Sequence, residues 1–221
     1  HTGATFVLIR VEYNSGDPEL YVVPLSIATG KDRDDILKNN PAIVVARLQD
    51  NSGEEGVLYG SFRSKAFCEG LLQALQRKRR FKGETGDLVT ASTRLFRNLM
   101  GDDVCLVPSV QRSEQSNTSV VYGDRLILKL FRRIEEGVNP DLEIGRYLTE
   151  KTNFRNIAPV AGWIEYQRNG TKMTAAILQA YVPNKGDAWS YSIDALSRYF
   201  PRALARGTQG AAPPDLPSNP L

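Results

Sequence analysis

Residues Arg112–Arg133 read RSEQSNTSVVYGDRLILKLFRR, and this stretch decides the fold. Two apolar, β-branched runs, 119–122 and 125–131, flank Gly123 and Asp124, a pattern typical of a β-hairpin with a two-residue turn. Side chains alternate between the two faces of a strand. This alternation predicts Leu126, Leu128 and Leu130 on one face and Ile127, Lys129 and Phe131 on the other. Lys129 is then the only charge inside an otherwise apolar strand.

A lysine in such a strand needs an anionic partner, because removing an unpaired ammonium from water costs several kcal/mol or neutralises the group. The sequence offers two partners: a phosphate held by the polar turn before the hairpin, or Glu143 on the segment that follows. A simpler interpretation is that Lys129 protects an edge strand from aggregation and Glu143 is a solvated helix residue.

The segment after the hairpin has the signals of a helix over residues 140–152. Asn139 suits the N-cap, Pro140 the first helical position and Asp141 the positive end of the dipole, while apolar residues recur at helical spacing. A second hairpin follows, with Asn169 and Gly170 at its turn. The predicted elements come in the order of a protein-kinase N-terminal lobe and its hinge. They are strands, a strand that carries the lysine, a helix that carries the glutamate, two further strands and a polar linker.

Three segments carry a family resemblance: SEQSNTSVVYGDRLILKLFRRIEEGVNPDLEIGRYLTE (113–150), APVAGWIEY (158–166) and LQAYVPNKGDAWSY (178–191). They resemble the N-terminal half of bacterial maltokinases, including those fused behind a trehalose synthase domain. The resemblance is specific over residues 109–191 and weaker over the first hundred. It implies a kinase-like fold with an N-terminal cap subdomain, and an enzyme that uses ATP and Mg²⁺ to convert maltose to maltose 1-phosphate.

The resemblance also implies roles for individual residues. Lys129 matches the strand lysine that contacts the α and β phosphates, and Glu143 matches the helix glutamate that holds it. Ile127 would roof the adenine. The remaining nucleotide-binding candidates are a phosphate-covering loop, Ser116, Asn117, Thr118 and Ser119, and a hinge, Gln179, Tyr181 and Val182. A solvated turn is the alternative for the loop, because Ser and Asn clusters are ordinary turn chemistry.

The predicted fold class is α+β, with an antiparallel kinase-like lobe behind a β-rich cap that contains one helix. Successive hairpins and an apolar stripe at Phe67, Leu71, Leu72 and Leu75 predict the cap, whose sheet is either continuous with the lobe sheet or laid against it. A further strand is expected near 104–107. The expected divisions are 1–103 for the cap, 104–191 for the lobe, and 192–221 for a helix start and a Pro/Gly-rich linker.

The chain shows no recognisable motif for the catalytic step of phosphoryl transfer. The one histidine of the sequence is His1, so an H-x-D frame is absent, and Asp194 and Asp215 lie in no catalytic or metal-binding motif. We therefore expect a truncated chain whose catalytic residues and Mg²⁺ ligands belong to an absent C-terminal lobe, and which is inactive alone. The alternative is a non-catalytic interaction or regulatory module built on a kinase-like lobe.

Composition is that of a globular protein: 221 residues, 41% hydrophobic, 24% charged and a net charge of +3. No apolar run approaches the ~20 residues of a membrane span, and no signal peptide is recognisable. The basic run at 77–82 favours a solvated helix end over a nucleic-acid site. We expect a cytoplasmic protein with reduced Cys68 and Cys105 and neither membrane nor nucleic-acid partners. Its expected partners are ATP, maltose and a trehalose synthase domain or subunit.

Overall fold

A computed structural model describes residues 3–101, 106–111, 117–184, 186 and 188–207. Residues 1–182 form one compact unit and residues 183–221 a second. The first unit mixes helices with antiparallel sheets, which confirms the α+β class. None of the helices in the described part combines the length and apolarity needed to cross a bilayer.

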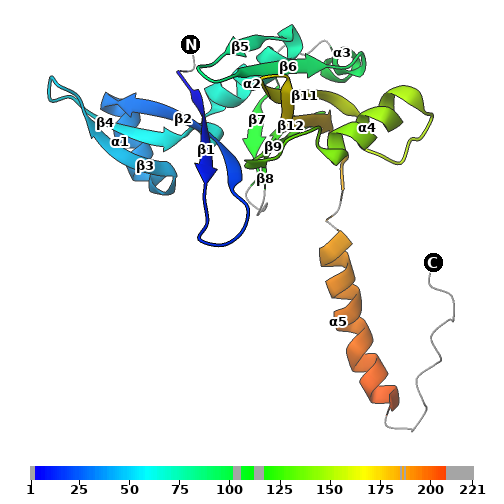
Figure 1. Cartoon of the computed structure of the whole chain (residues 1–221). Helices are drawn as coiled ribbons and strands as arrows, with labels where there is room; N and C mark the ends of the chain where they lie inside the picture. The colour runs from blue at the N-terminus through cyan, green and yellow to red at the C-terminus, as the bar shows by residue number, and fades with distance from the viewer. Residues whose placement is uncertain (1–2, 102–105, 112–116, 185, 187, 208–221) are drawn as a thin grey trace. The chain divides into compact units, whose positions relative to one another are not determined.

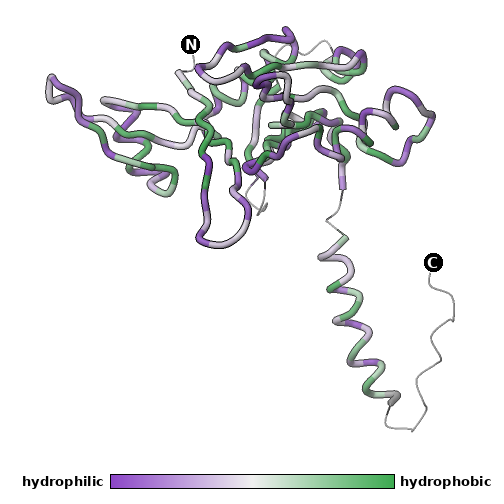
Figure 2. The backbone as a smooth tube through the Cα atoms, in the orientation of Figure 1, coloured by the Kyte–Doolittle hydropathy of each residue, from purple (hydrophilic) through white to green (hydrophobic). Residues whose placement is uncertain are grey.

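The smaller sheet is built from the N-terminal strands β1 (Thr5–Val11), β2 (Glu19–Thr29), β3 (Val44–Gln49) and β4 (Glu55–Gly60) in the order β1-β2-β4-β3. Two successive hairpins, β1–β2 and β3–β4, are present, which confirms the pattern of hairpins predicted for the cap. Figure 2 shows hydrophilic colouring along the loop between β1 and β2, as expected for a solvated turn. Helix α1 (Gly30–Asn39) and the 3₁₀ turns η1 (Pro41–Ile43) and η2 (Ser61–Arg63) complete this part.

The larger sheet has seven strands in the order β5-β6-β11-β12-β9-β8-β7. Their bounds are β5 (Arg80–Lys82), β6 (Asp87–Ser92), β7 (Pro108–Val110), β8 (Asn117–Tyr122), β9 (Leu126–Phe131), β11 (Val160–Arg168) and β12 (Thr171–Ala180). Strands from both sides of residue 103 thus share one sheet, because β6 pairs with β11. Continuity with the lobe sheet therefore holds for β5 and β6, whereas β1–β4 form a separate sheet. The division at residue 103 stays a proposal.

A short strand, β10 (Arg133–Ile134), links the two sheets. It follows β9 of the larger sheet but pairs with β2 of the smaller one, and the Val22 N–H donates to the Arg132 carbonyl at 2.7 Å. A two-residue strand with one buried residue, Ile134, carries no visible periodicity, so its sequence did not predict this crossover.

One of the two predicted two-residue turns is confirmed, and the other is one residue longer. The 169–170 turn has the expected two residues, with positive φ at Asn169 (49°) and Gly170 (82°). The 123–124 turn instead includes Arg125, because Tyr122 pairs with Leu126. The strand expected near 104–107 was wrong where it can be seen: Leu106 and Val107 are outside any strand, and β7 begins at Pro108. Residues 104 and 105 lie outside the described residues.

Helix α2 (Lys65–Arg77) covers one face of the larger sheet. Ser64 caps its N-terminus by accepting from the Phe67 N–H at 3.3 Å, and Lys78 ends it in the left-handed conformation at φ 50°. The predicted stripe is buried and packs with Leu126, Leu128 and Leu130 of β9. Helix α3 (Leu95–Met100) adds Phe96 and Met100 to the same core. The inward face predicted for β9 is therefore confirmed.

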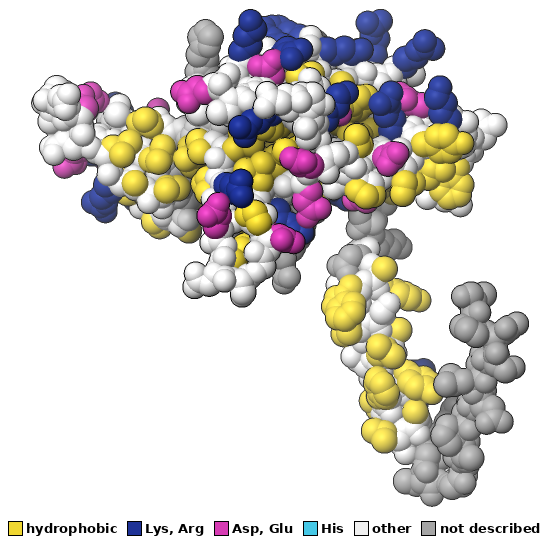
Figure 3. Space-filling view, viewed as in Figure 1, with side chains coloured by type: hydrophobic (Ala, Val, Ile, Leu, Met, Phe, Trp, Pro, Cys, Tyr) yellow, Lys and Arg dark blue, Asp and Glu magenta, His cyan; other side chains and the backbone are white. Residues whose placement is uncertain are grey.

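Helix α4 (Pro140–Lys151) lies over the opposite face of the sheet and begins as predicted. The Asn139 side chain accepts from the Asp141 N–H at 2.9 Å, and Leu142 enters a second core with Phe131, Val160 and Ile177. Helix α5 (Ala188–Gly207) belongs to the second unit; it contains the helix start expected at 192 and extends in both directions. Its colours alternate in Figure 2, and it exposes several large apolar side chains, shown in yellow in Figure 3.

The basic run 77–82 forms the end of α2 and the edge strand β5. Figure 3 shows Lys and Arg side chains gathered where Figure 1 places β5 and β6. Arg80 pairs with Asp87 at 2.6 Å, and Lys78 is the α2 C-cap. These roles support the solvated helix end, and the absence of a nucleic-acid partner stays a prediction.

A cluster of polar side chains, Tyr13, Glu19, Tyr21 and Arg133, joins β10 to the start of β2. The Glu19 carboxylate accepts from the hydroxyls of Tyr13 (2.6 Å) and Tyr21 (2.7 Å) and pairs with Arg133. These hydrogen bonds, that of Tyr13 foremost, lower the pKa of Glu19 from 4.5 to about 2, and the carboxylate in turn raises the pKa of Tyr13.

We expect Glu19→Gln to lower the thermal unfolding midpoint near neutral pH by a modest amount, because the cluster is open to solvent. The folded pKa of Glu19 lies below its unfolded value of 4.5, so its contribution is present above that value and is lost as the pH falls toward about 2. Unfolding midpoints of both proteins across pH 2–7 measure this. Glu54→Gln, an exposed control, removes one charge elsewhere. An unchanged difference between Glu19→Gln and the parent at the lowest pH would contradict the assignment.

Candidate functional site

Five of the predicted nucleotide-binding residues lie on one face of three adjacent strands. In β9, Ile127 and Lys129 point to the face opposite the leucines, and the register places Ser119 beside Lys129 and Asn117 beside Phe131 in β8. Gln179 of β12 lies beside Ile127 on the other side. Cross-strand partners share a face of the sheet, with Cβ atoms roughly 5 Å apart. The hairpin register therefore brings together residues that are up to sixty positions apart in the chain.

Lys129 sits in the middle of this face. Ser119 is its neighbour in β8 and Ile177 its neighbour in β12. Ile177 is 1% exposed and Phe131, two residues along β9, is 9% exposed, whereas Lys129 remains partly accessible. Lys129 is thus a partly accessible charge among buried apolar side chains, a setting in which an anion interacts with it more strongly than in free solution.

The Ser119 hydroxyl is a buried polar group without a partner. Ser119 is 0% exposed, and its Oγ makes no hydrogen bond within the described residues. Buried hydroxyls are nearly always hydrogen-bonded, and leaving one unsatisfied costs about 1–3 kcal/mol. A hydroxyl that is orphaned directly across from a lysine is able to donate to an anionic oxygen that the lysine also attracts.

Glu143 lies in the first turn of α4, where its N–H donates to the Asn139 carbonyl at 3.0 Å. Its side chain is exposed, and within the described residues no ion pair joins it to Lys129. Both residues therefore flank the same face of the sheet without touching. Their expected pairing stays a prediction for the ligand-bound protein.

The other loop candidates are placed differently. Thr118 faces away from Lys129, beside Leu130, and its hydroxyl accepts from Arg132 Nε at 3.3 Å. Arg132 Nη2 also donates to the Asn117 carbonyl at 3.2 Å. Arg132 thus holds the strand end that leads into the loop, a role the sequence analysis missed and for which the paired arginines after β9 were the available signal. Ser116 lies outside the described residues.

The hinge candidates end β12 and leave the sheet. Gln179 Nε2 donates to the Ala158 carbonyl at 3.4 Å, and the Tyr181 N–H donates to the Arg125 carbonyl at 2.8 Å. That N–H is committed to the fold, so it is not the donor for an adenine edge. Val182, 53% exposed, is the last residue of the first unit.

The residues on this face fit a phosphate group. Lys129 supplies a positive charge, Ser119 an unused donor, and Ile127 an apolar surface beside them. For a metal the described residues offer less, because no three of their His, Cys, Asp or Glu side chains gather where they could hold an ion.

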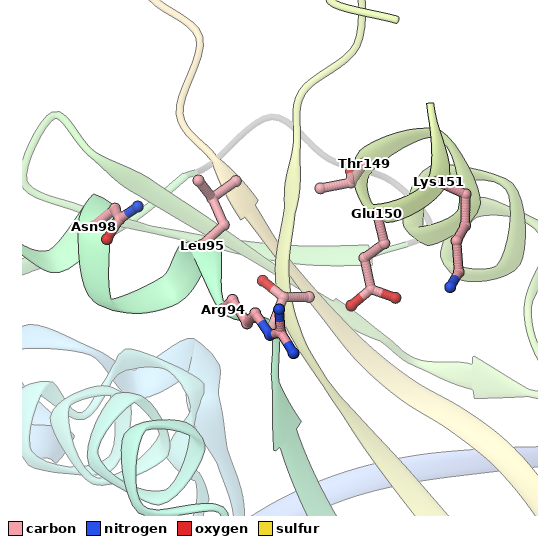
Figure 4. Close-up of a pocket in the computed structure, with 7 residues that line it drawn as sticks. Arg94, Leu95, Asn98, Thr149, Glu150 and Lys151 are labelled. Atoms are coloured by element: carbon pink, nitrogen blue, oxygen red, sulfur yellow. The ribbon is translucent and has the colours of Figure 1, made fainter. Parts of the chain in front are cut away.

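Two cavities lie elsewhere. One, of about 530 Å³, lies between the start of α3 and the end of α4. Figure 4 shows Arg94, Leu95 and Asn98 on one side and Thr149, Glu150 and Lys151 on the other. The side chains that line it carry charges of both signs. Glu150 already pairs with Arg146 at 2.9 Å, and the Arg146 guanidinium stacks over Trp163, 4.7 Å from the ring centre. The second cavity, of about 510 Å³, borders the other side of β8.

No protein-family profile matches the sequence. Three solved structures of glucosamine kinase are similar over 94% of the chain. One, in complex with glucosamine, ADP and inorganic phosphate, has a TM-score of 0.44 at 16% identity. Crystal form A has a TM-score of 0.46 at 16% identity, and crystal form B has 0.42 at 19%. The chain spans 38–41% of the length of these kinases.

Proposed function

We propose that this chain is the ATP-binding part of a sugar kinase of the maltokinase type. The observation that carries the proposal is the buried Ser119 hydroxyl, which has no hydrogen-bond partner within the described residues and lies directly across the strand pair from Lys129. Together they supply the charge and the donor that a triphosphate needs. The sequence resemblance over residues 109–191 supports the same assignment independently.

In this proposal Lys129 holds the α and β phosphates, and Glu143 orients Lys129 once the nucleotide is bound. Ile127 and Gln179 lie along the same face on the adenine side. Asn117, at the start of β8, lies nearest the loop that covers the phosphates, Ser119 lies beside Lys129, and Arg132 fixes the strand end. Bound Mg²⁺ would neutralise charge on the phosphates, and its ligands are expected outside the described residues.

The acceptor in the proposal is maltose, and the product is maltose 1-phosphate. The aspartate that accepts the sugar hydroxyl proton would come from a C-terminal lobe of the complete protein, as kinase chemistry requires. A trehalose synthase domain or subunit as the supplier of maltose, and a cytoplasmic location, belong to the same proposal and rest on the resemblance alone.

Ser119→Ala separates a ligand-binding hydroxyl from a structural one. Removing an unsatisfied buried hydroxyl is expected to raise the free energy of unfolding by about 1 kcal/mol, while weakening ATP binding. Urea unfolding and ATP titration calorimetry measure the two effects on one protein. Ser109→Ala, an exposed serine on β7, is the matched control and should change neither.

A higher free energy of unfolding together with weaker ATP binding in Ser119→Ala would support the proposal. If Ser119→Ala instead destabilises the protein and leaves ATP affinity unchanged, the hydroxyl serves the fold. Failure of the complete protein to bind ATP at all would favour the non-catalytic module.

A further inference from the structure

The cavity of about 510 Å³ lies where the two sheets meet. On one side it is lined by Asn40, Ile43 and Gly60 of the smaller sheet and its turns, and on the other by the start of α2 and strands β7 and β8. Thr118 lines it, whereas its neighbour Ser119 faces Lys129. The cavity is therefore on the opposite side of β8 from the proposed nucleotide face.

Three cations from three separate elements line this cavity: Arg63 of η2, Lys65 of α2 and Arg132 after β9. Arg63 donates to Asn40 Oδ1 at 3.5 Å, Lys65 pairs with Glu69 at 3.7 Å, and Arg132 is held by Thr118 and Asn117. No Asp or Glu is among the described residues that line it. Three like charges sharing one cavity repel one another, and a bound anion relieves that repulsion.

Helix α2 strengthens the positive field. Lys65 and Cys68, from its first turn, line the cavity, so the positive end of a thirteen-residue helix lies there too. The remaining walls are apolar at Ile43, Phe62 and Val110, with amide residues Asn40 and Gln111 beside them. A bare ion would make no contact with these walls, whereas a small organic group with hydroxyls would contact both the apolar and the amide side chains.

We propose that this cavity binds an organic phosphate monoester of sugar-phosphate size. Its phosphate lies among Arg63, Lys65 and Arg132, and its body lies against Phe62 and Val110. The site is separate from the Lys129 face and does not depend on the proposed kinase function. A ligand there would contact both sheets and the strand that leads into the proposed phosphate loop.

The test is calorimetric titration of the 221-residue chain with glucose 1-phosphate, and separately with inorganic phosphate, at low and high ionic strength. We expect saturable glucose 1-phosphate binding that weakens with salt. Arg63→Gln and Lys65→Gln should each lower affinity about tenfold, the usual cost of losing one charge-assisted hydrogen bond. Both positions are exposed and each substitution removes one of three like charges, so unfolding midpoints should not fall.

Two controls locate the ligand. Arg47→Gln, an exposed arginine on β3, removes the same charge away from the cavity and should leave affinity unaltered. Lys129→Ala should also leave it unaltered, which distinguishes this site from the nucleotide face. An equal loss with Arg47→Gln, loss only with Lys129→Ala, no saturable binding, or inorganic phosphate binding as tightly as the sugar phosphate would each overturn the proposal.

Discussion

Lys129→Ala is expected to lower the ATP affinity of the complete protein at least tenfold and its turnover by roughly 10²-fold, with the fold retained. The lysine is partly accessible and its Cβ remains in place, so little packing is lost. The loss in turnover has the size usual for removing one preorganised group that stabilises charge in a transition state. ATP titration calorimetry and steady-state kinetics with maltose measure the two effects.

Lys172→Ala is the matched control for this change, because Lys172 is an exposed lysine on the neighbouring strand β12. It removes the same charge and should change neither affinity nor turnover. Unaltered ATP affinity and turnover in Lys129→Ala would show that the lysine does not contact nucleotide. The alternative role of protecting an edge strand is wrong, because β9 pairs with β12 on one side and with β8 on the other. Loss of folding in Lys129→Ala, seen by circular dichroism, would contradict its placement on an accessible face.

Leu128→Ala, one residue earlier, is expected to have the opposite phenotype. Leu128 is 0% exposed and packs in the main core against α2, so truncation should lower the free energy of unfolding by about 2–5 kcal/mol. Urea denaturation measures the loss. Leu48→Ala, at a leucine 36% exposed on β3, should cost far less.

The pair of substitutions tests the alternation of β9 itself. If Leu128→Ala were tolerated and Lys129→Ala unfolded the chain, the strand would present the opposite face to the core. A one-residue slip in register would have that consequence, because it exchanges the two faces of a strand.

Much of the fold could be predicted from local pattern. The apolar stripe of α2, the Asn139 cap of α4 and the two-residue turn at Asn169 and Gly170 are signals read within a few neighbouring residues, and the structure confirms each. Helix α1 was not predicted, because none of its residues is buried and it therefore lacks an apolar stripe. Strand β7 was misplaced because the apolar run at 104–107 has the composition of a strand, whereas Leu106 is buried in the core without belonging to one.

The candidate site likewise has features that local pattern predicts and features that depend on the tertiary structure. Alternation in β9 was enough to place Lys129 opposite the leucines, and the family resemblance was enough to name its companions. Which residues stand beside Lys129 depended on the register of β8 and β12, which pairs Ser119 and Ile177 with it. The orphaned state of the Ser119 hydroxyl could be seen only once its surroundings were known.

By itself the sequence determined the periodic elements, the two faces of β9 and the single lysine on one of them, because these follow from the bonding and side-chain alternation of adjacent residues. Only the tertiary structure decided that β5 and β6 join the larger sheet, that β10 crosses to the smaller one, and that three cations meet in one cavity. Those features join residues far apart in the chain, and such pairings are selected by the free energy of the whole packed unit rather than by any local preference.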